Sequence, residues 1–382
     1  MKILLVGEYN SSHHTLKEGL VALGHQVTVV GLGDGFKKRQ VDVNFVQPFT
    51  SGFKLFLKRV VYKLFKKDLN SQSIQKQFFQ NQTIFKGNDI VQLINEVSFQ
   101  TVPKIEKELL DFIFKNNKKV FLLSCGTDYV SVKYAMDKKF RYSIATPYLE
   151  KKGDEAQFQH MTQYLQPEFV SLHHYIFENI HGVIASDLDY DIPLRGYPEY
   201  LGMVPNPVNL SKFTYHLPKI EDKVIIFHGI NTNNYYKKGN DIFEKALALV
   251  AETHSDKIEV VTVRSVPYAE YIRLFDNCHI LLDQVFAYDQ GFNALEAMAK
   301  GKVVFTGAEQ EFLEYYQLAE DEVAINALPD AQKIAEKLIW LIHNPQKIIE
   351  ISKNARAFVE KEHDHVLAAT RYFEKWTMNN GC

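Results

Sequence analysis

Short apolar runs alternate with amphipathic stretches along most of the chain. The first apolar run covers residues 3–6 and ends at Gly7, and apolar residues then recur at helical spacing over 16–23. A second apolar run covers residues 27–30. A strand, a helix and a strand in this order predict a βαβ unit, whose strands are parallel and buried on both faces.

The same alternation continues on both sides of a proline-rich segment. Five of the 12 prolines lie between residues 193 and 218, where a helix or a central strand could not easily continue. The other apolar runs that predict strands are 90–94, 120–123 and 183–185 before this segment, and 224–227, 258–263, 280–282 and 303–305 after it. We therefore predict an amino-terminal α/β domain over residues 1–200, a linker over 201–217, a carboxy-terminal α/β domain over 218–365 and a last helix within 366–382.

The composition is that of a globular protein long enough for two cores. Of the 382 residues, 46% are hydrophobic and 24% are charged, and the formal net charge is −2. This charge implies no general attraction to nucleic acid, so we expect no nucleic-acid partner. Three widely spaced cysteines indicate neither a disulfide framework nor a zinc site. Because no apolar run is long enough for a signal peptide or a membrane span, we expect a cytoplasmic protein.

The loops that follow the strands of the second half carry the first candidate site. In open α/β sheets, ligands bind beyond the carboxyl ends of the strands. Here His228 and Gly229 follow a predicted strand, and Lys237 and Lys238 stand at the start of the next helix. Free backbone N–H groups and the positive end of the helix dipole suit this position to phosphate. The alternative is that both lysines are simply solvated.

A second candidate site lies in residues 283–304. Gly291 allows a ligand to approach the backbone closely, and Glu296 stands one turn inside the following helix among apolar neighbours. A carboxylate in such surroundings must pair or accept hydrogen bonds, and it can accept from two adjacent sugar hydroxyls. The alternative is a surface glutamate on an exposed helix face.

Three motifs in the second half occur together, in the order VPNPVNLSKF (204–213), HG with KKGND (228–241) and LEAMAKGKVVFTG (295–307). Together they resemble the donor domain of the retaining GT-B glycosyltransferases of family 4. The amino half is similar more loosely, through its opening βαβ unit, the GTD at 126–128 and the GVIASD at 182–187. The resemblance implies an α/β fold with two Rossmann-like parallel-sheet domains that face each other across a cleft. It also implies that the last helix returns to the amino-terminal domain.

The resemblance assigns roles to the residues at matching positions. Lys238 would hold the donor diphosphate and Glu296 the nucleotide ribose, and these two with Asp128 are the implied catalytic residues. The full implied donor set is Gly229, Asn231, Lys238, Gly239, Arg264, Ser265, Val266, Asp289, Gln290, Gly291, Phe292, Asn293 and Glu296. The implied acceptor-binding residues are Asn10, Ser11, Ser12 and His13.

The sequence departs from the family pattern at three places. Tyr288 stands where the family has the first glutamate of its Glu-seven-residues-Glu motif, although Asp289 and Asp283 are near enough to substitute. The arginine usual after the first strand of the donor domain is absent. In the amino-terminal domain, residues 10–14 replace the expected glycine-rich turn.

The resemblance implies transfer of a sugar, with retention, from a nucleotide sugar to a hydroxyl of a glycan or lipid-linked acceptor. The donor would be a UDP- or GDP-sugar, as in polysaccharide biosynthesis for the cell envelope, and the reaction would use no metal and no cofactor. One alternative is a sugar-nucleotide epimerase on the same fold. Another is an inactive donor-binding homologue, for which Tyr288 and the missing arginine are the motivating features.

The Asp-x-Asp pattern at residues 187–191 is a competing signal. Another glycosyltransferase fold uses such a pattern for metal, but here position six is Ile192 and position twelve is Pro198, so a calcium loop is excluded. We interpret the segment as a solvated loop and expect no metal site.

Residues 53–67 form a basic amphipathic stretch. Six lysines and arginines and no acid share it with a helical stripe of apolar side chains. Such a helix can lie on an anionic membrane surface, which would place the protein at the inner face of the cytoplasmic membrane. The alternative is a helix whose apolar face packs on the core and whose basic rim is solvated.

Overall fold

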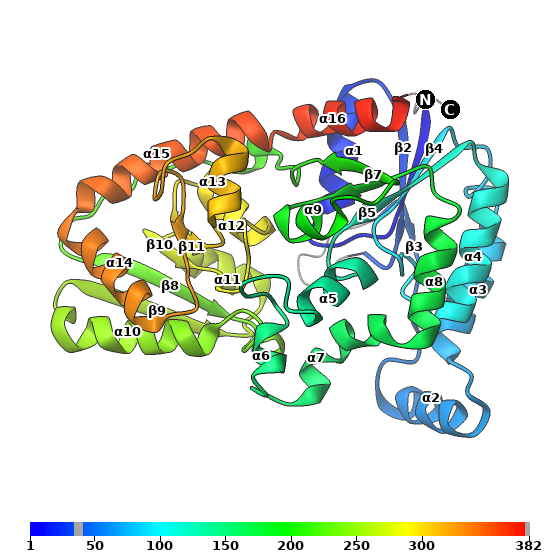
Figure 1. The fold of residues 1–382 in the computed structure, drawn as a ribbon, viewed down its shortest axis with the longest axis horizontal. Coiled ribbons are helices and arrows are strands. Elements are labelled where there is room, and N and C mark those ends of the chain that lie inside the picture. The colour runs from blue at the N-terminus through cyan, green and yellow to red at the C-terminus, as the bar shows by residue number, and fades with distance from the viewer. Residues whose placement is uncertain (34–40, 379–382) are drawn as a thin grey trace.

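The computed structural model describes residues 1–33 and 41–378. These residues fold into two α/β domains, each built around one sheet (Figure 1). The amino-terminal sheet has the strand order β3-β2-β1-β4-β5-β6-β7, and the carboxy-terminal sheet has the order β12-β11-β10-β8-β9. Every strand pair described is parallel. The predicted fold class, α/β with two Rossmann-like parallel sheets, is confirmed.

The amino-terminal sheet is buried because helices cover it. Its strands are β1 (Lys2–Val6), β2 (Gln26–Gly31), β3 (Val43–Asn44), β4 (Ile90–Leu93), β5 (Lys119–Ser124), β6 (Val183–Ala185) and β7 (Tyr200–Met203). Its helices are α1 (Ser12–Ala22), α2 (Gly52–Phe65), α3 (Leu69–Gln80), α4 (Pro103–Asn116), α5 (Tyr129–Met136), α6 (Thr146–Leu149), α7 (Glu155–Thr162), α8 (Pro167–Phe177) and α9 (Leu188–Leu194). In β1, Ile3, Leu4, Leu5 and Val6 are all fully buried, which explains the unbroken apolar run of the sequence.

The carboxy-terminal domain repeats this plan with fewer strands. Its strands are β8 (Val224–Ile230), β9 (Ile258–Arg264), β10 (Ile280–Leu282), β11 (Val303–Thr306) and β12 (Ile325–Asn326). Its helices are α10 (Asn240–His254), α11 (Tyr268–Phe275), α12 (Phe292–Ala299), α13 (Gln310–Tyr316), α14 (Ala331–His343) and α15 (Pro345–Glu362). The loops after β8 and β10 carry Lys237, Lys238 and Gly291, whereas His228 and Gly229, expected to follow the strand, lie within β8, and Glu296 lies in α12.

The last helix, α16 (His365–Thr377), leaves the second domain and packs on the first (Figure 1). It lies against α1 so closely that a Cβ atom on Gly19 would come within 2.8 Å of the Ala369 side chain. Trp376 is fully buried, and its indole N–H donates to the Gln92 side chain at 3.1 Å. The end of the chain therefore completes the core of the amino-terminal domain.

The proline-rich segment is more regular than its composition suggested. Helix α9 runs through Pro193, and β7 begins two residues after Pro198. Strand β7 lies at the edge of the sheet, where one side of the ladder needs no partner, so prolines nearby are tolerated. Within the described residues, no helix combines the length and apolar character that crossing a bilayer requires.

Candidate functional site

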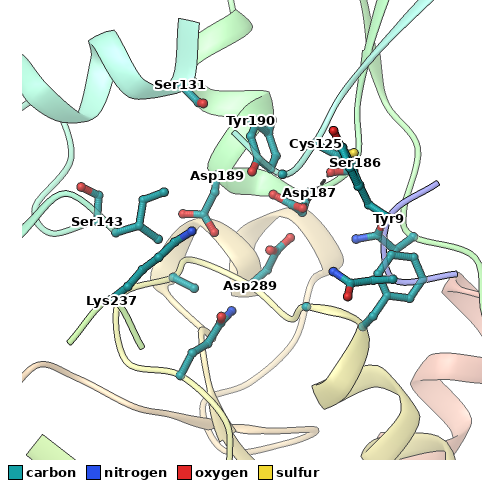
Figure 2. Close-up of a pocket in the computed structure, with 18 of the residues that line it drawn as sticks. Tyr9, Cys125, Ser131, Ser143, Ser186, Asp187, Asp189, Tyr190, Lys237 and Asp289 are labelled. Atoms are coloured by element: carbon teal, nitrogen blue, oxygen red, sulfur yellow. Dashed lines mark hydrogen bonds between the residues drawn. The ribbon is translucent and has the colours of Figure 1, made fainter. Parts of the chain in front are cut away.

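A cavity of about 300 Å³ lies between the two domains. Its amino-terminal wall comes from the loops after β1, β5 and β6 together with residues of α5 and the segment before α6. Its carboxy-terminal wall comes from the loops after β8 and β10. Because parallel strands all end at the same edge of their sheet, this is the place where polar loop residues of both domains can meet. Figure 2 shows side chains of both domains pointing into the space between them.

Lys238 is held at the cavity wall by a buried carboxylate. Its Nζ donates to Asp283 Oδ1 at 3.0 Å, and the same oxygen accepts from Asn293 Nδ2 at 3.0 Å. Asp283 is only 4% exposed, so this carboxylate fixes both donors in place. Gly239, with φ at 71°, follows and opens α10 in a left-handed conformation that glycine adopts without strain. The sequence prediction for Lys238 thus matches a cation that stands at a helix amino terminus.

Lys237 also lines the cavity, and in Figure 2 it reaches toward Asp189. Its Nζ lies 2.9 Å from His160 Nε2 of α7, in the other domain. Burial and the neighbouring Lys238 lower the pKa of Lys237 to about 8. Burial and the Lys237 charge lower the pKa of His160 to about 4, so this imidazole is neutral and can accept the hydrogen bond. The alternative that both lysines are simply solvated does not describe Lys237.

Three carboxylates meet opposite the lysines. One oxygen each from Asp187, Asp189 and Asp289 lies within 4.8 Å of the others. Burial, then the repulsion of the neighbouring carboxylates, raises the pKa of Asp189 and of Asp289 well above the ordinary value, and burial raises that of Asp187 to about 7. Such a group can bind a hard cation through oxygen, or it can hold and exchange protons near neutral pH.

The interpretation of residues 187–191 as a solvated loop is wrong. The segment forms the first turn of α9, and the other domain covers it. Asp289 Oδ2 accepts from Leu188 N at 2.9 Å, and Asp189 Oδ2 accepts from Tyr288 N at 3.2 Å. The sequence could not show this, because the covering residues lie about a hundred positions further along the chain.

Glu296 lies on the first turns of α12, 8% exposed, in a smaller hollow next to the main cavity. Phe292 lines both spaces, and the smaller one also receives Ser11, Thr15 and Lys212. Lys238 and Glu296 therefore lie on the same wall, in adjoining hollows on either side of the start of α12. That both side chains serve one elongated ligand stays a prediction.

Tyr288 does not take the place of the missing family glutamate in the cavity. Its hydroxyl accepts a hydrogen bond from Arg141 N of the amino-terminal domain at 3.0 Å. The Arg141 guanidinium in turn donates to Glu309 and to Glu311, each at 2.7 Å. Tyr288 thus belongs to a polar contact between the domains, whereas its neighbour Asp289 lines the cavity.

The structure brings together a part of the predicted donor set. Lys238, Asp289, Gly291 and Phe292 line the main cavity and Glu296 lines the adjoining hollow. The predicted donor residues that line neither space are Gly229, Asn231, Gly239, Arg264, Ser265, Val266, Gln290 and Asn293.

Several of the predicted donor residues that line neither space have structural partners elsewhere. Arg264 pairs with Glu244, and Gln290 donates to Gly307 O at 2.8 Å. A Cβ atom on Gly229 would come within 2.5 Å of the Tyr271 ring, so this glycine lets Tyr271 pack closely against β8.

Of the predicted site residues in the amino-terminal domain, some line the two spaces and others do not. Asn10 and Ser12 line the main cavity, and Ser11 lines the smaller hollow. His13 lies instead in the domain core, fully buried, with its Nδ1 2.8 Å from Gly7 O, and burial lowers its pKa to about 3. Asp128 caps α5 by accepting from Ser131 N at 2.8 Å and is not among the lining residues.

Sequence reasoning missed part of the amino-terminal wall. The cavity residues that it did not assign to a site there include Tyr9, Ser131, Ser143, Asp189 and Tyr190. The Asp-x-Asp pattern was the one signal that could have identified Asp189. Tyr9 and Ser143 lie in loops, Ser131 in α5 and Tyr190 in α9, and their place at the cavity depends on the tertiary fold.

Part of the chain resembles a known family in sequence, and the whole chain resembles solved structures in fold. Residues 235–374 match a family model described as glycosyl transferase-like. No curated protein sequence matches the chain. Among solved structures, HepE from Anabaena in complex with UDP and glucose aligns with a TM-score of 0.59 and 14% identity, covering 98% of each chain.

Two further structures align over almost their full length. Sucrose-phosphate synthase from Thermosynechococcus elongatus gives a TM-score of 0.60 at 13% identity, with 98% of each chain covered. TarM of S. aureus gives a TM-score of 0.60 at 10% identity, with 99% of each chain covered. The predicted GT-B fold and the resemblance to GT-B glycosyltransferases are confirmed, while membership of family 4 and retention stay predictions.

Proposed function

We propose that this chain is a glycosyltransferase that moves a sugar from a nucleotide-sugar donor to a hydroxyl of a glycan or lipid-linked acceptor. The observation that carries the proposal is one wall of the interdomain cavity, where Lys237 and Lys238 stand beside the start of α12. Solved structures with the same fold support it: HepE was obtained with UDP-glucose, and TarM with UDP and α-GlcNAc-glycerol.

The chemistry of such a transfer explains the positive wall. As the bond to the sugar breaks, negative charge grows on the departing diphosphate, and fixed positive groups lower the barrier most when they already point at it. Two ammonium groups and the amino end of α12 supply that charge from the protein itself. We therefore propose a reaction that needs no divalent metal, with a UDP- or GDP-sugar as donor and retention at the sugar carbon.

A thermal-shift panel with UDP, GDP, ADP and their sugars tests the donor. A ligand at a hundred times its dissociation constant stabilises the folded state by about 2.7 kcal/mol, which is easily detected. Transfer is then assayed with the donor that binds, in the presence and absence of EDTA. The proposal predicts that EDTA leaves the rate unchanged. Donor binding without any turnover would instead indicate an inactive donor-binding homologue.

The carboxyl cluster at the cavity favours a second candidate, a sugar-nucleotide epimerase. Such an enzyme needs acid and base groups around the sugar ring, and Asp187, Asp189 and Asp289 have raised pKa values at the cavity. Incubation with a nucleotide sugar alone separates the two functions. An epimerase changes the sugar without an acceptor, whereas a glycosyltransferase leaves it unchanged apart from slow hydrolysis.

A further inference from the structure

Helix α2 is set apart from the rest of the amino-terminal domain. In Figure 1 it projects from the lower end of the molecule, away from the sheet. None of its residues is buried, although it is one of the longer helices of the domain. The alternative interpretation of this segment, a helix whose apolar face packs on the core, is therefore wrong.

The apolar stripe of α2 is largely exposed. The side chains of Phe53, Phe56 and Leu64 are 77%, 61% and 67% exposed, and Leu57 is 38% exposed. At 100° per residue, these four positions fall within one stripe, and the rings of Phe53 and Phe56 lie 6.2 Å apart along it. Water-exposed aromatic and aliphatic side chains in such a stripe are costly unless another surface covers them.

Basic side chains border this stripe. Lys54 and Lys58 lie on one side of it, and Arg59 and Lys63 lie on the other. Lys66 and Lys67 extend the basic border beyond the helix, and the first acid, Asp68, comes only after them. Apart from Lys58, which pairs with that aspartate at 3.1 Å, the helix presents its cations outward.

We propose that α2 is a membrane-binding helix that lies in the interface of a lipid bilayer rich in anionic headgroups. An apolar stripe between two basic borders fits that occupant, because the stripe enters the acyl boundary while the lysines and arginine stay at headgroup level. A protein groove would have to cover the stripe and also bring acidic groups to both borders. The binding does not depend on the proposed reaction, and its test uses no enzymatic activity.

The test measures co-sedimentation of the full chain with vesicles. Vesicles of phosphatidylglycerol and phosphatidylcholine are compared with vesicles of phosphatidylcholine alone. Two double variants are tested. Phe53→Ser with Phe56→Ser removes the apolar stripe, and Lys54→Glu with Lys63→Glu reverses the charge of the basic border. We expect the chain to bind the anionic vesicles, and each double variant to bind them at least about tenfold more weakly.

Matched controls separate this surface from general charge and from misfolding. The double variant Lys245→Glu with Lys353→Glu makes the same change of charge at exposed positions of the carboxy-terminal domain and should bind like the original chain. Because α2 buries none of its residues, both test variants should keep the original melting temperature. Hydrogen exchange over residues 52–65 should slow when anionic vesicles are added.

Three results would overturn the proposal. One is equal binding to vesicles without anionic lipid, and another is binding that survives loss of the apolar stripe. The third is a chain that self-associates through α2, shown if Phe53→Ser with Phe56→Ser converts an oligomer to a monomer while vesicle binding is unchanged.

Discussion

The two walls of the interdomain cavity differ in the charges that they contribute. Among the described lining residues, both cations, Lys237 and Lys238, come from the carboxy-terminal wall. The described lining of the amino-terminal wall has no lysine or arginine and offers Asp187, Asp189 and hydroxyls such as that of Ser143, whereas the carboxy-terminal wall adds one carboxylate, Asp289, to its two cations. A negatively charged donor would therefore be held by one domain, while a neutral hydroxyl acceptor would be met by the other.

This difference explains why the residues of the carboxy-terminal wall are easier to predict from the sequence. A helix amino terminus after a strand suits phosphate, and a lysine placed there leaves a local sequence pattern. A wall that meets a sugar hydroxyl can be built from many polar residues, and its position depends on how the loops fold. The following predictions test the division of roles, beginning with the largest effect.

Replacing Lys238 should cause the greatest loss of activity. Lys238→Ala removes a preorganised charge from the proposed diphosphate site, and we expect turnover to fall by about a hundredfold, or about 3 kcal/mol in the barrier. Steady-state kinetics with the donor found by thermal shift measures this. Because the change also leaves the buried Asp283 without its lysine, Lys238→Gln serves as the second variant, since its amide can still donate.

Lys245→Ala, on the exposed side of α10, is the matched control and should keep full activity. Near-normal turnover of both Lys238 variants would show that the carboxy-terminal wall is not the one that holds the leaving diphosphate.

Replacing Glu296 should weaken nucleotide binding by about tenfold or more, the scale of a hydrogen bond to a charged group. If this carboxylate holds the ribose, the original chain should bind a ribonucleotide more tightly than its 2′-deoxy form, and Glu296→Ala should bind both equally. Calorimetric titration with the two nucleotides measures the difference. An unchanged preference for ribose would remove Glu296 from the donor site.

Lys237 should make the reaction sensitive to pH. Its pKa is lowered to about 8, so its positive charge is present below that pH and is lost as the pH rises through it. We expect kcat/KM for the donor to decline above about pH 8. Lys237→Arg should move this decline to higher pH because arginine stays charged, while Lys237→Met should lower kcat/KM by about tenfold at neutral pH and abolish this part of the decline.

The carboxyl cluster should make the folded chain less stable as the pH rises. A carboxyl whose pKa is lowered on folding would have the opposite effect. The pKa of Asp187 is raised from 3.8 to about 7, so between these values the folded chain binds more protons than the unfolded chain. Stability should therefore fall as pH rises through this window, by a few degrees in Tm or about 1 kcal/mol or more.

Thermal unfolding from about pH 5 to pH 8 measures this dependence. Asp187→Asn should flatten the profile, and Asp137→Asn, at an exposed position, should leave it unchanged. A profile that does not respond to Asp187→Asn would show that this carboxyl is ionised and solvated as an ordinary surface acid.

Most strands of both sheets could be predicted from the sequence, because a parallel strand that is buried on both faces is an unbroken apolar run. The runs at 183–185 and 280–282 became β6 and β10 without any change of bounds. The same logic fails for short edge strands such as β3 and β12, which have two residues each and leave no pattern.

The sequence predicted only those site residues whose role depends on their neighbours in the chain. Lys238 and Glu296 are defined by their places at the start of a helix, whereas Asp187 and Asp189 become half-buried only when the other domain covers them. His13 and Asp128 show the reverse error. Both residues follow strands, as ligand-binding residues do, but one fills the domain core and the other caps a helix.

The path of α16 has a consequence for the order in which the protein matures on the ribosome. Strand β7, the last of the amino-terminal sheet, ends at Met203, but the helix that brings Trp376 into that domain begins only at His365. The first domain to emerge must therefore wait with an uncovered apolar surface until the whole second domain has been translated. Severing the gene between the domains would yield a leading fragment that lacks part of its own interior.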